Sequence, residues 1–134
     1  PLVVIDGAHN AAGLASFRAS LRWHFGSPKA IGVVGMLGDK DIWGSARELA
    51  GVFDHLILTT APGERGLAAS ELADVFSDED VQIEDIEADF WKAYEQAIRL
   101  GAETNRPVFV TGSLYLVGAV LAKLQEQDKD DIAE

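Results

Sequence analysis

Cysteine is absent from all 134 residues of this chain. Disulfide bonds and thiolate zinc sites are therefore excluded, and the composition suits a reducing compartment, so we expect a cytoplasmic protein. No apolar run approaches the roughly 18 residues that a membrane span requires. Basic residues are also scarce. The chain has 11 lysines and arginines and 22 acidic residues, which gives a net charge of −11. This charge argues against nucleic acid and anionic membranes as partners, since both bind basic surfaces.

Several motifs of nucleotide and metal chemistry are missing as well. No G-x-G-x-x-G or G-x-x-x-x-G-K-[ST] sequence occurs, so the chain contains no self-sufficient phosphate-binding loop. His9, His24 and His55 are too far apart for an H-E-x-x-H zinc site, and we expect no metal ligands here. No serine turn shows the G-x-S-x-G pattern of a nucleophile elbow. The sequence thus disfavours metal-dependent and serine-nucleophile catalysis by this chain alone.

Five apolar runs of strand length alternate with five segments of helical periodicity. This alternation predicts an α/β fold, a Rossmann-like three-layer domain with a mainly parallel sheet and helices on both faces. The runs are residues 2–5, 30–36, 55–60, 81–86 and 108–111. We expect one domain over 1–134. Because a strand follows Pro1 almost at once, we also expect the chain to be a fragment of a longer protein.

The helices are predicted from the spacing of apolar residues and from capping residues. They are expected at about 11–25, after an Asp41 N-cap, after a Ser70 cap, at about 88–100 and from Ser113 onward. Gly101 is expected to end the fourth helix in a left-handed conformation. The spacing of the fifth helix predicts that four apolar residues face the core: Leu114, Val117, Leu121 and Leu124.

Two polar turns follow strands whose carboxyl ends should share one edge of the sheet. They are Asp6-Gly-Ala-His-Asn10 and Thr111-Gly-Ser-Leu-Tyr115. Ligands of open α/β sheets bind outside the carboxyl ends of the strands, where an acid can hold ribose hydroxyls and a histidine can contact phosphate or carboxylate oxygens. The alternative is structural: Asp6, Asn10 and Ser113 cap helices. In that alternative His9 is a surface imidazole and Tyr115 packs half-buried.

Two further turns contain candidate residues with weaker signals. Asp39 and Lys40 follow the second apolar run, and they either face the crevice or form a solvated ion pair. Arg65 is the only cation of the turn over 59–66. It either contacts a ligand or a neighbouring domain, or it lies on the surface.

Three motifs, in this order across the whole chain, resemble the C-terminal domain of folylpolyglutamate synthase/dihydrofolate synthase, within the Mur ligase superfamily. They are Asp6-Gly-Ala-His-Asn10, Gly38-Asp-Lys-Asp41 and Thr111-Gly-Ser-Leu-Tyr-Leu-Val-Gly118. Cell-wall Mur ligases are similar in fold, but they usually show D-Y-A-H-N/H at the first site and lack G-S-L-Y-L-V-G at the last. Two departures from the family pattern are Ala11, where proline is common, and Gly66, where alanine is frequent.

The resemblance implies an ATP-dependent ligase that adds L-glutamate to folate or to dihydropteroate through an acyl phosphate. It implies that His9 is catalytic and that Asp6 and Asn10 bind ATP. Ser113 and Tyr115 would bind the incoming glutamate. The phosphate-binding loop and the Mg²⁺ ligands are expected on an N-terminal ATPase domain of the same polypeptide, so this domain alone should be inactive.

Two alternatives stay open beside the folate ligase. One is the C-terminal domain of a cell-wall Mur ligase, and the other is a free-standing nucleotide-sensing α/β module. A receiver-like module is disfavoured because the third run ends in Thr59-Thr60, where a phosphorylatable aspartate would be needed. For the ligase we expect a monomer, and the sequence leaves open whether folate, dihydropteroate or both are substrates.

Overall fold

The computed structural model describes residues 1–25, 29–38, 41–50 and 52–133. Strands and helices alternate along the chain. The strands are β1 (Val3–Ile5), β2 (Ile31–Val34), β3 (His55–Leu58), β4 (Ile83–Ile86) and β5 (Val108–Thr111). The helices are α1 (Ala11–Phe25), α2 (Ile42–Leu49), α3 (Ala69–Phe76), α4 (Phe90–Thr104) and α5 (Leu114–Ala133).

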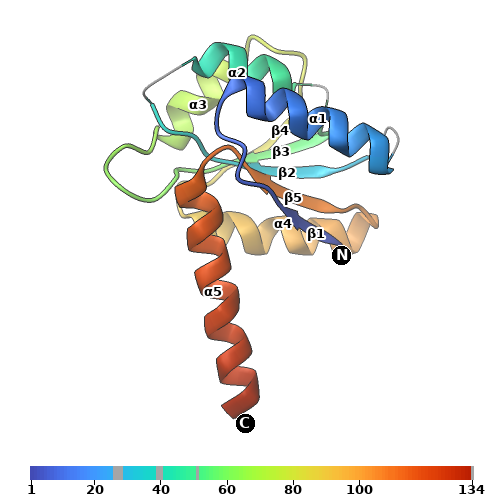
Figure 1. Ribbon diagram of the computed structural model, residues 1–134, viewed down its shortest axis with the longest axis vertical. Helices are drawn as coiled ribbons and strands as arrows, with labels where there is room; N and C mark the ends of the chain where they lie inside the picture. The colour runs from blue at the N-terminus through green and yellow to red at the C-terminus, as the bar shows by residue number, and fades with distance from the viewer. Residues whose placement is uncertain (26–28, 39–40, 51, 134) are drawn as a thin grey trace.

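The strands form one parallel sheet of five strands in the order β1-β5-β2-β3-β4. Figure 1 shows α1, α2 and α3 over one face of this sheet and α4 and α5 on the other side. The three-layer α/β fold predicted from the alternation of apolar runs is therefore confirmed. Because β5 lies between β1 and β2, the loops that follow these three strands meet at one end of the sheet, where open α/β folds bind ligands.

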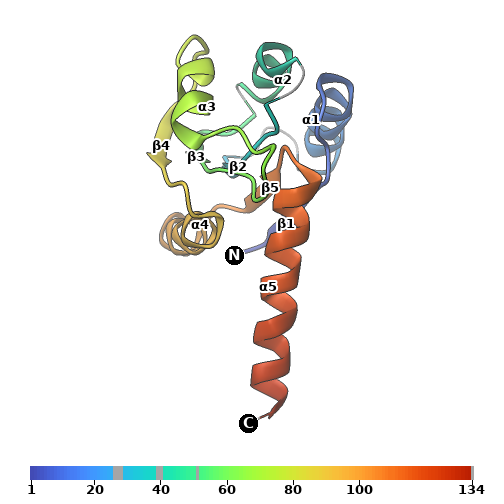
Figure 2. The same ribbon diagram turned by 90° about the vertical axis from the view of Figure 1, so that its left-hand side faces the viewer.

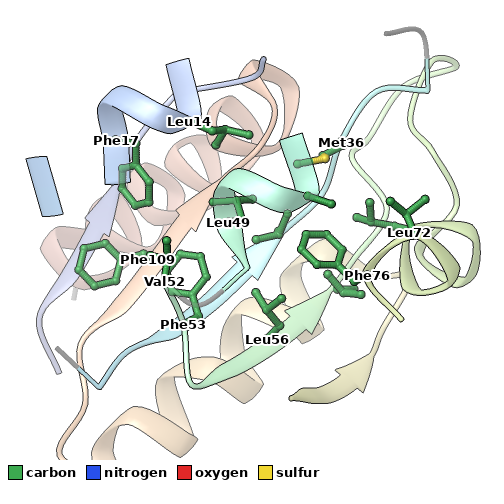
Figure 3. Close-up of a cluster of buried hydrophobic side chains, with 14 of the residues drawn as sticks. Leu14, Phe17, Met36, Leu49, Val52, Phe53, Leu56, Leu72, Phe76 and Phe109 are labelled. Atoms are coloured by element: carbon green, nitrogen blue, oxygen red, sulfur yellow. The ribbon is translucent and has the colours of Figure 1, made fainter. Parts of the chain in front are cut away.

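The larger core cluster fills the space between the sheet and helices α1, α2 and α3. Figure 3 shows Phe17 of α1, Phe109 of β5 and Phe53 lying close together in it. The ring centroids of Phe17 and Phe109 are 5.9 Å apart at an interplanar angle of 71°, an edge-to-face contact. Such pairs add about 0.5–1.5 kcal/mol beyond the burial of their surface. This packing holds α1, and with it the turn before α1, against the sheet.

On the opposite face, α4 approaches the sheet through small residues, and Ala93, Ala97 and Gly101 are buried. A Cβ on Gly101 would lie 2.9 Å from the Arg106 carbonyl oxygen, so this glycine permits close packing inside the helix. The predicted left-handed stop at Gly101 is wrong. The helix continues to Thr104, and Asn105 takes the left-handed conformation with φ 55°, which asparagine tolerates better than most residues.

The predicted Ser70 cap is also wrong. Helix α3 begins at Ala69, and its N-cap residue Ala68 offers no side-chain hydrogen bond. Instead the Thr60 hydroxyl oxygen accepts a hydrogen bond from the Ala69 N–H at 2.9 Å. The capping oxygen comes from the loop after β3, so the spacing within the helix did not reveal it.

Only the first part of α5 packs on the rest of the domain, and Figure 2 shows the remainder projecting away from it. Leu116 and Val120 are fully buried, whereas Leu114 is 59% and Leu121 43% exposed. The predicted inward face is therefore wrong at Leu114 and Leu121. The run from Leu114 to Leu121 is almost wholly apolar, so periodicity alone did not select the buried side. None of the described helices combines the length and apolar character needed to cross a membrane.

Candidate functional site

The loops after β1 and β5 are joined by backbone hydrogen bonds. The Asp6 N–H donates to the Val110 carbonyl at 3.0 Å, which extends the pairing one residue beyond β1. The Gly112 N–H donates to the Ala8 carbonyl at 3.0 Å, and the Thr111 hydroxyl donates to the same oxygen at 3.4 Å. The predicted meeting of the two polar turns at one edge of the sheet is confirmed.

Asp6 and Asn10 shape the first turn. Asp6 Oδ1 accepts a hydrogen bond from the Ala8 N–H at 2.8 Å, and Asn10 Oδ1 accepts one from the Gly13 N–H at 2.8 Å. Asn10 therefore caps α1, as the structural alternative proposed. Within the described part of the chain, Asp6 Oδ2 and the Asn10 amide nitrogen make no hydrogen bond. Both residues thus combine a structural bond with a polar atom that can meet a ligand.

His9 is exposed, and its Nδ1 lies 3.0 Å from the Gly7 carbonyl oxygen. A carbonyl oxygen only accepts hydrogen bonds, so Nδ1 carries the proton when the imidazole is neutral. Nε2 then bears the lone pair. The turn therefore presents a proton acceptor at the carboxyl end of β1.

A cavity of about 580 Å³ opens where α1, α2 and α5 begin. Its walls come from the first turns of these helices and from the loops after β1, β2 and β3: His9, Asn10, Ala11, Ala12, Met36, Leu37, Asp41, Ile42, Ser45, Arg65, Leu114 and Tyr115. Helix N-termini present partial positive charge and unsatisfied N–H groups. Arg65 adds a positive side chain to this wall and Asp41 a negative one.

Ser113 and Tyr115 lie differently at the start of α5. Ser113 is fully buried, and its Oγ accepts hydrogen bonds from the Tyr115 N–H at 3.1 Å and the Leu116 N–H at 3.4 Å. The hydroxyl thus caps α5, in agreement with the structural alternative. Tyr115 is 53% exposed and lines the cavity. The Ser113 cap fixes the turn that brings Tyr115 to the cavity.

Arg65 reaches the cavity from the loop after β3. The Gly38 N–H donates to the Arg65 carbonyl at 3.0 Å, and the Leu67 N–H donates to the Met36 carbonyl at 2.8 Å. These bonds tie the loop after β3 to the loop after β2. Arg65 and Tyr115 also line a smaller neighbouring cavity of about 230 Å³. Asp39 and Lys40 lie outside the described residues.

Asp41 is the N-cap of α2, as predicted, because its Oδ1 accepts a hydrogen bond from the Gly44 N–H at 2.8 Å. The sequence predicted no role for Asp41 beyond this cap, but Asp41 also lines the cavity. Ser45, one helical turn later, lines it too. Residues four apart share a helix face, so the position of Asp41 could have pointed to Ser45. Among the described residues, no group of three or more histidine and acidic side chains could hold a metal ion.

Comparison with protein families matches residues 1–114 to the Mur ligase family, glutamate ligase domain. Folylpolyglutamate synthase of Lacticaseibacillus casei is 31% identical over 120 residues, which cover 90% of this chain and 26% of that protein. The chain therefore spans about a quarter of the length of this relative.

Solved structures of the same kind superpose on this fold. Folylpolyglutamate synthase of Mycobacterium tuberculosis, complexed with ADP and AMPPCP, matches with a TM-score of 0.81 and 28% identity, covering 88% of this chain and 28% of that one. The bifunctional folylpolyglutamate synthase/dihydrofolate synthase of Yersinia pestis, complexed with AMPPNP and a Mn ion, matches with a TM-score of 0.77 and 31% identity. That match covers 93% of this chain and 29% of the other.

Proposed function

The chain belongs to the Mur ligase family as a glutamate ligase domain, and from this premise we propose that it is the C-terminal domain of a folylpolyglutamate synthase/dihydrofolate synthase. The complete enzyme would use ATP to join L-glutamate to folate, to dihydropteroate or to both. One observation carries the proposal beyond the family. His9, Asn10 and Tyr115, which belong to motifs more than a hundred residues apart, line one cavity.

The proposal includes a second domain of the same polypeptide, because this chain spans 26% of the L. casei relative. An N-terminal ATPase domain would supply the phosphate-binding loop, and the ligands of Mg²⁺ would also lie there. A domain of net charge −11 can border a polyphosphate only if its partner and the metal contribute cations. The present domain would close over ATP from the other side, and alone it would have no ligase activity.

On the nucleotide side, we assign ribose binding to Asp6. Its Oδ2 makes no hydrogen bond with the described residues, while Oδ1 is held by the Ala8 N–H, so the carboxylate is oriented before a ligand arrives. The Asn10 amide nitrogen would donate to an oxygen of ATP, because Asn10 Oδ1 is already engaged by Gly13. Both assignments use atoms at the carboxyl end of β1.

On the glutamate side, we assign the incoming amino acid to the cavity. Tyr115 would hold it directly, and Ser113 would act through the cap that fixes the first turn of α5. Arg65 would add positive charge for a carboxylate. We place Asp39 and Lys40 at the same crevice on the strength of the second motif alone.

The reaction proposed for the complete enzyme proceeds by acyl transfer. A substrate carboxylate takes the γ-phosphoryl group of ATP and becomes an acyl phosphate. The amine of glutamate then attacks the acyl carbon, a C–N bond forms, and the C–O bond to phosphate breaks from a tetrahedral intermediate. The nitrogen must lose a proton, and His9 Nε2 would accept it, because Nδ1–H is fixed on the Gly7 carbonyl.

His9→Ala in the full-length enzyme tests this assignment. Groups that act on developing charge lower kcat when removed, so kcat should fall on the order of 10²-fold. The unfolding midpoint should change little, because His9 is exposed. The KM for glutamate should also change little, because His9 is assigned to the proton transfer and not to the binding of glutamate. Asp6→Ala should instead raise mainly the KM for ATP. Steady-state kinetics with ATP and glutamate varied separately decide, and a near-normal kcat for His9→Ala would reduce this residue to a surface imidazole.

A further inference from the structure

The backbone around Arg65 is paired with the loop after β2. An isolated antiparallel bridge joins Gly66 to that loop. Its two hydrogen bonds run from the Gly38 N–H to the Arg65 carbonyl at 3.0 Å and from the Leu67 N–H to the Met36 carbonyl at 2.8 Å. The backbone that carries Arg65 is therefore fixed by its neighbours, although the residue itself is exposed.

Gly66 permits this pairing because it has no side chain. A Cβ at position 66 would overlap the Ala61 carbonyl oxygen and would lie 3.0 Å from the Ala61 carbonyl carbon. Carbon atoms in favourable contact are about 3.5–4.0 Å apart. A methyl group at position 66 and the Ala61 carbonyl therefore cannot both occupy these places, and one of the two segments would have to move.

Ala61 is the segment that cannot give way. It is fully buried and belongs to the core cluster on the α4 side of the sheet. Its backbone nitrogen is also close to the end of β2, since a Cβ built on Gly35 would lie 3.1 Å from it. Gly66 is only partly buried. A side chain at position 66 would thus push residues 65–67 away from the loop after β2.

This displacement would carry Arg65 with it. Arg65 lines both the 580 Å³ cavity and the neighbouring cavity of about 230 Å³, so its reach into the larger one depends on where its backbone is held. Hydrogen bonds from arginine to a carboxylate are sensitive to distance and to the orientation of the guanidinium. A shift of the backbone by a fraction of an ångström would weaken such a contact.

We propose that Gly66 is a positioning residue of the ligase: its close approach to Ala61 holds Arg65 where the guanidinium meets a carboxylate of the incoming glutamate. This inference rests on the proposed function, which gives Arg65 that contact. Gly66 itself touches no substrate and acts only through the place of its neighbour.

A double-mutant cycle in the full-length enzyme tests this dependence. A hydrogen bond to a charged group contributes on the order of a tenfold to hundredfold change in affinity, so Arg65→Ala and Gly66→Ala should each raise the KM for glutamate by that order. The KM for ATP and the kcat at saturating glutamate should be nearly unchanged. The double variant should have the KM of Arg65→Ala alone, because Gly66 has no effect once the guanidinium is absent.

Gly63→Ala is the matched control in the same loop. It adds the same methyl group and strains the backbone at φ +105°, but it meets nothing within 4 Å. The KM for glutamate should therefore stay close to that of wild type, even though the loop is destabilised. An equal rise in Gly63→Ala would show that any strain in this loop weakens glutamate binding, and the specific role of Gly66 would be refuted.

Hydrogen exchange on the unaltered enzyme gives a second test that does not depend on the variants folding. The Gly38 and Leu67 N–H groups should exchange as slowly as the Thr59 N–H, which donates to the Val34 carbonyl at the end of β2. Rapid exchange at both would show that the pairing does not fix Arg65.

The kinetic outcomes separate this inference from the proposed function. An unchanged KM for glutamate in Gly66→Ala or in Arg65→Ala, or effects that multiply in the double variant, would overturn the positioning role and leave the ligase function standing. A wild-type enzyme that does not ligate glutamate at all would overturn both.

Discussion

Gly112→Ala is expected to lower the free energy of unfolding of this chain by about 4 kcal/mol. Gly112 has φ +108°, a conformation that residues with a side chain rarely adopt, and forcing it costs about 1–3 kcal/mol. An added Cβ would also lie 2.7 Å from the Gly35 carbonyl oxygen and 3.2 Å from Val34 Cγ1. Overpacking of this kind costs typically about 1–3 kcal/mol, and a backbone oxygen on a core strand end has little room to move.

The expected loss is large enough to measure by thermal or urea unfolding followed by circular dichroism. For a domain of this size, 1 kcal/mol corresponds to about 3–4 °C in Tm, so the midpoint should fall by about 14 °C. The Gly112 N–H also donates to the Ala8 carbonyl in the first turn. The same substitution should therefore disturb the cavity, and full-length Gly112→Ala should lose ligase activity even below its unfolding midpoint.

Two other glycines separate the contributions of backbone strain and steric clash. Gly63 has φ +105° with nothing within 4 Å of an added Cβ, so Gly63→Ala should show the strain alone, about 1–3 kcal/mol. Gly118 lies in α5, also with open space around it, and Gly118→Ala should stabilise by about 0.5–1 kcal/mol. If Gly112→Ala were no more destabilising than Gly63→Ala, the close approach to Gly35 would not restrict position 112 and the reasoning would fail.

Two further predictions concern stability. The N–H of Lys92 donates to Asp89 at the start of α4 and, with the N–H of Trp91, holds the pKa of this carboxyl below its ordinary value. The ionised Asp89 carboxylate therefore stabilises the folded chain above the pKa that Asp89 has in the unfolded chain, and this contribution is lost as the pH falls through its lower pKa in the folded chain. Asp89→Asn should thus make the free energy of unfolding fall less steeply with decreasing pH below about pH 4, as measured by urea unfolding. Phe109→Ala should cost about 3–5 kcal/mol, because Phe109 is 1% exposed among aromatic rings; a loss below about 1 kcal/mol would contradict this core.

The fold could be predicted because its strongest signal is local. Buried parallel strands are short apolar runs and amphipathic helices have a period near 3.6, and both patterns were visible between Leu2 and Leu124. The errors arose where a partner distant in the sequence decides the structure. Thr60 replaces Ser70 as the cap of α3, and Arg106 and Val108 require a glycine at position 101 inside α4.

The site could be predicted only in outline. Polar turns at strand ends identified the edge of the sheet, and the structure brings His9, Asn10, Arg65 and Tyr115 to one cavity there. Ser113 could be placed at the turn, but its burial under α5 depends on packing that spacing does not show. Ser45 was missed because a serine inside a helix has no motif of its own. Its place in the wall of the cavity depends on how α2 packs, which is a three-dimensional property.

Incorporation of labelled L-glutamate by the full-length polypeptide tests the central claim most directly. With ATP, Mg²⁺ and either folate or dihydropteroate as acceptor, we expect an amide-linked glutamate product and the release of one ADP and one phosphate for each glutamate added. The 134-residue chain alone should form no product under the same conditions. ATP hydrolysis without an amide product, or glutamate transfer to a cell-wall peptide precursor in preference to both folate-type acceptors, would contradict the account.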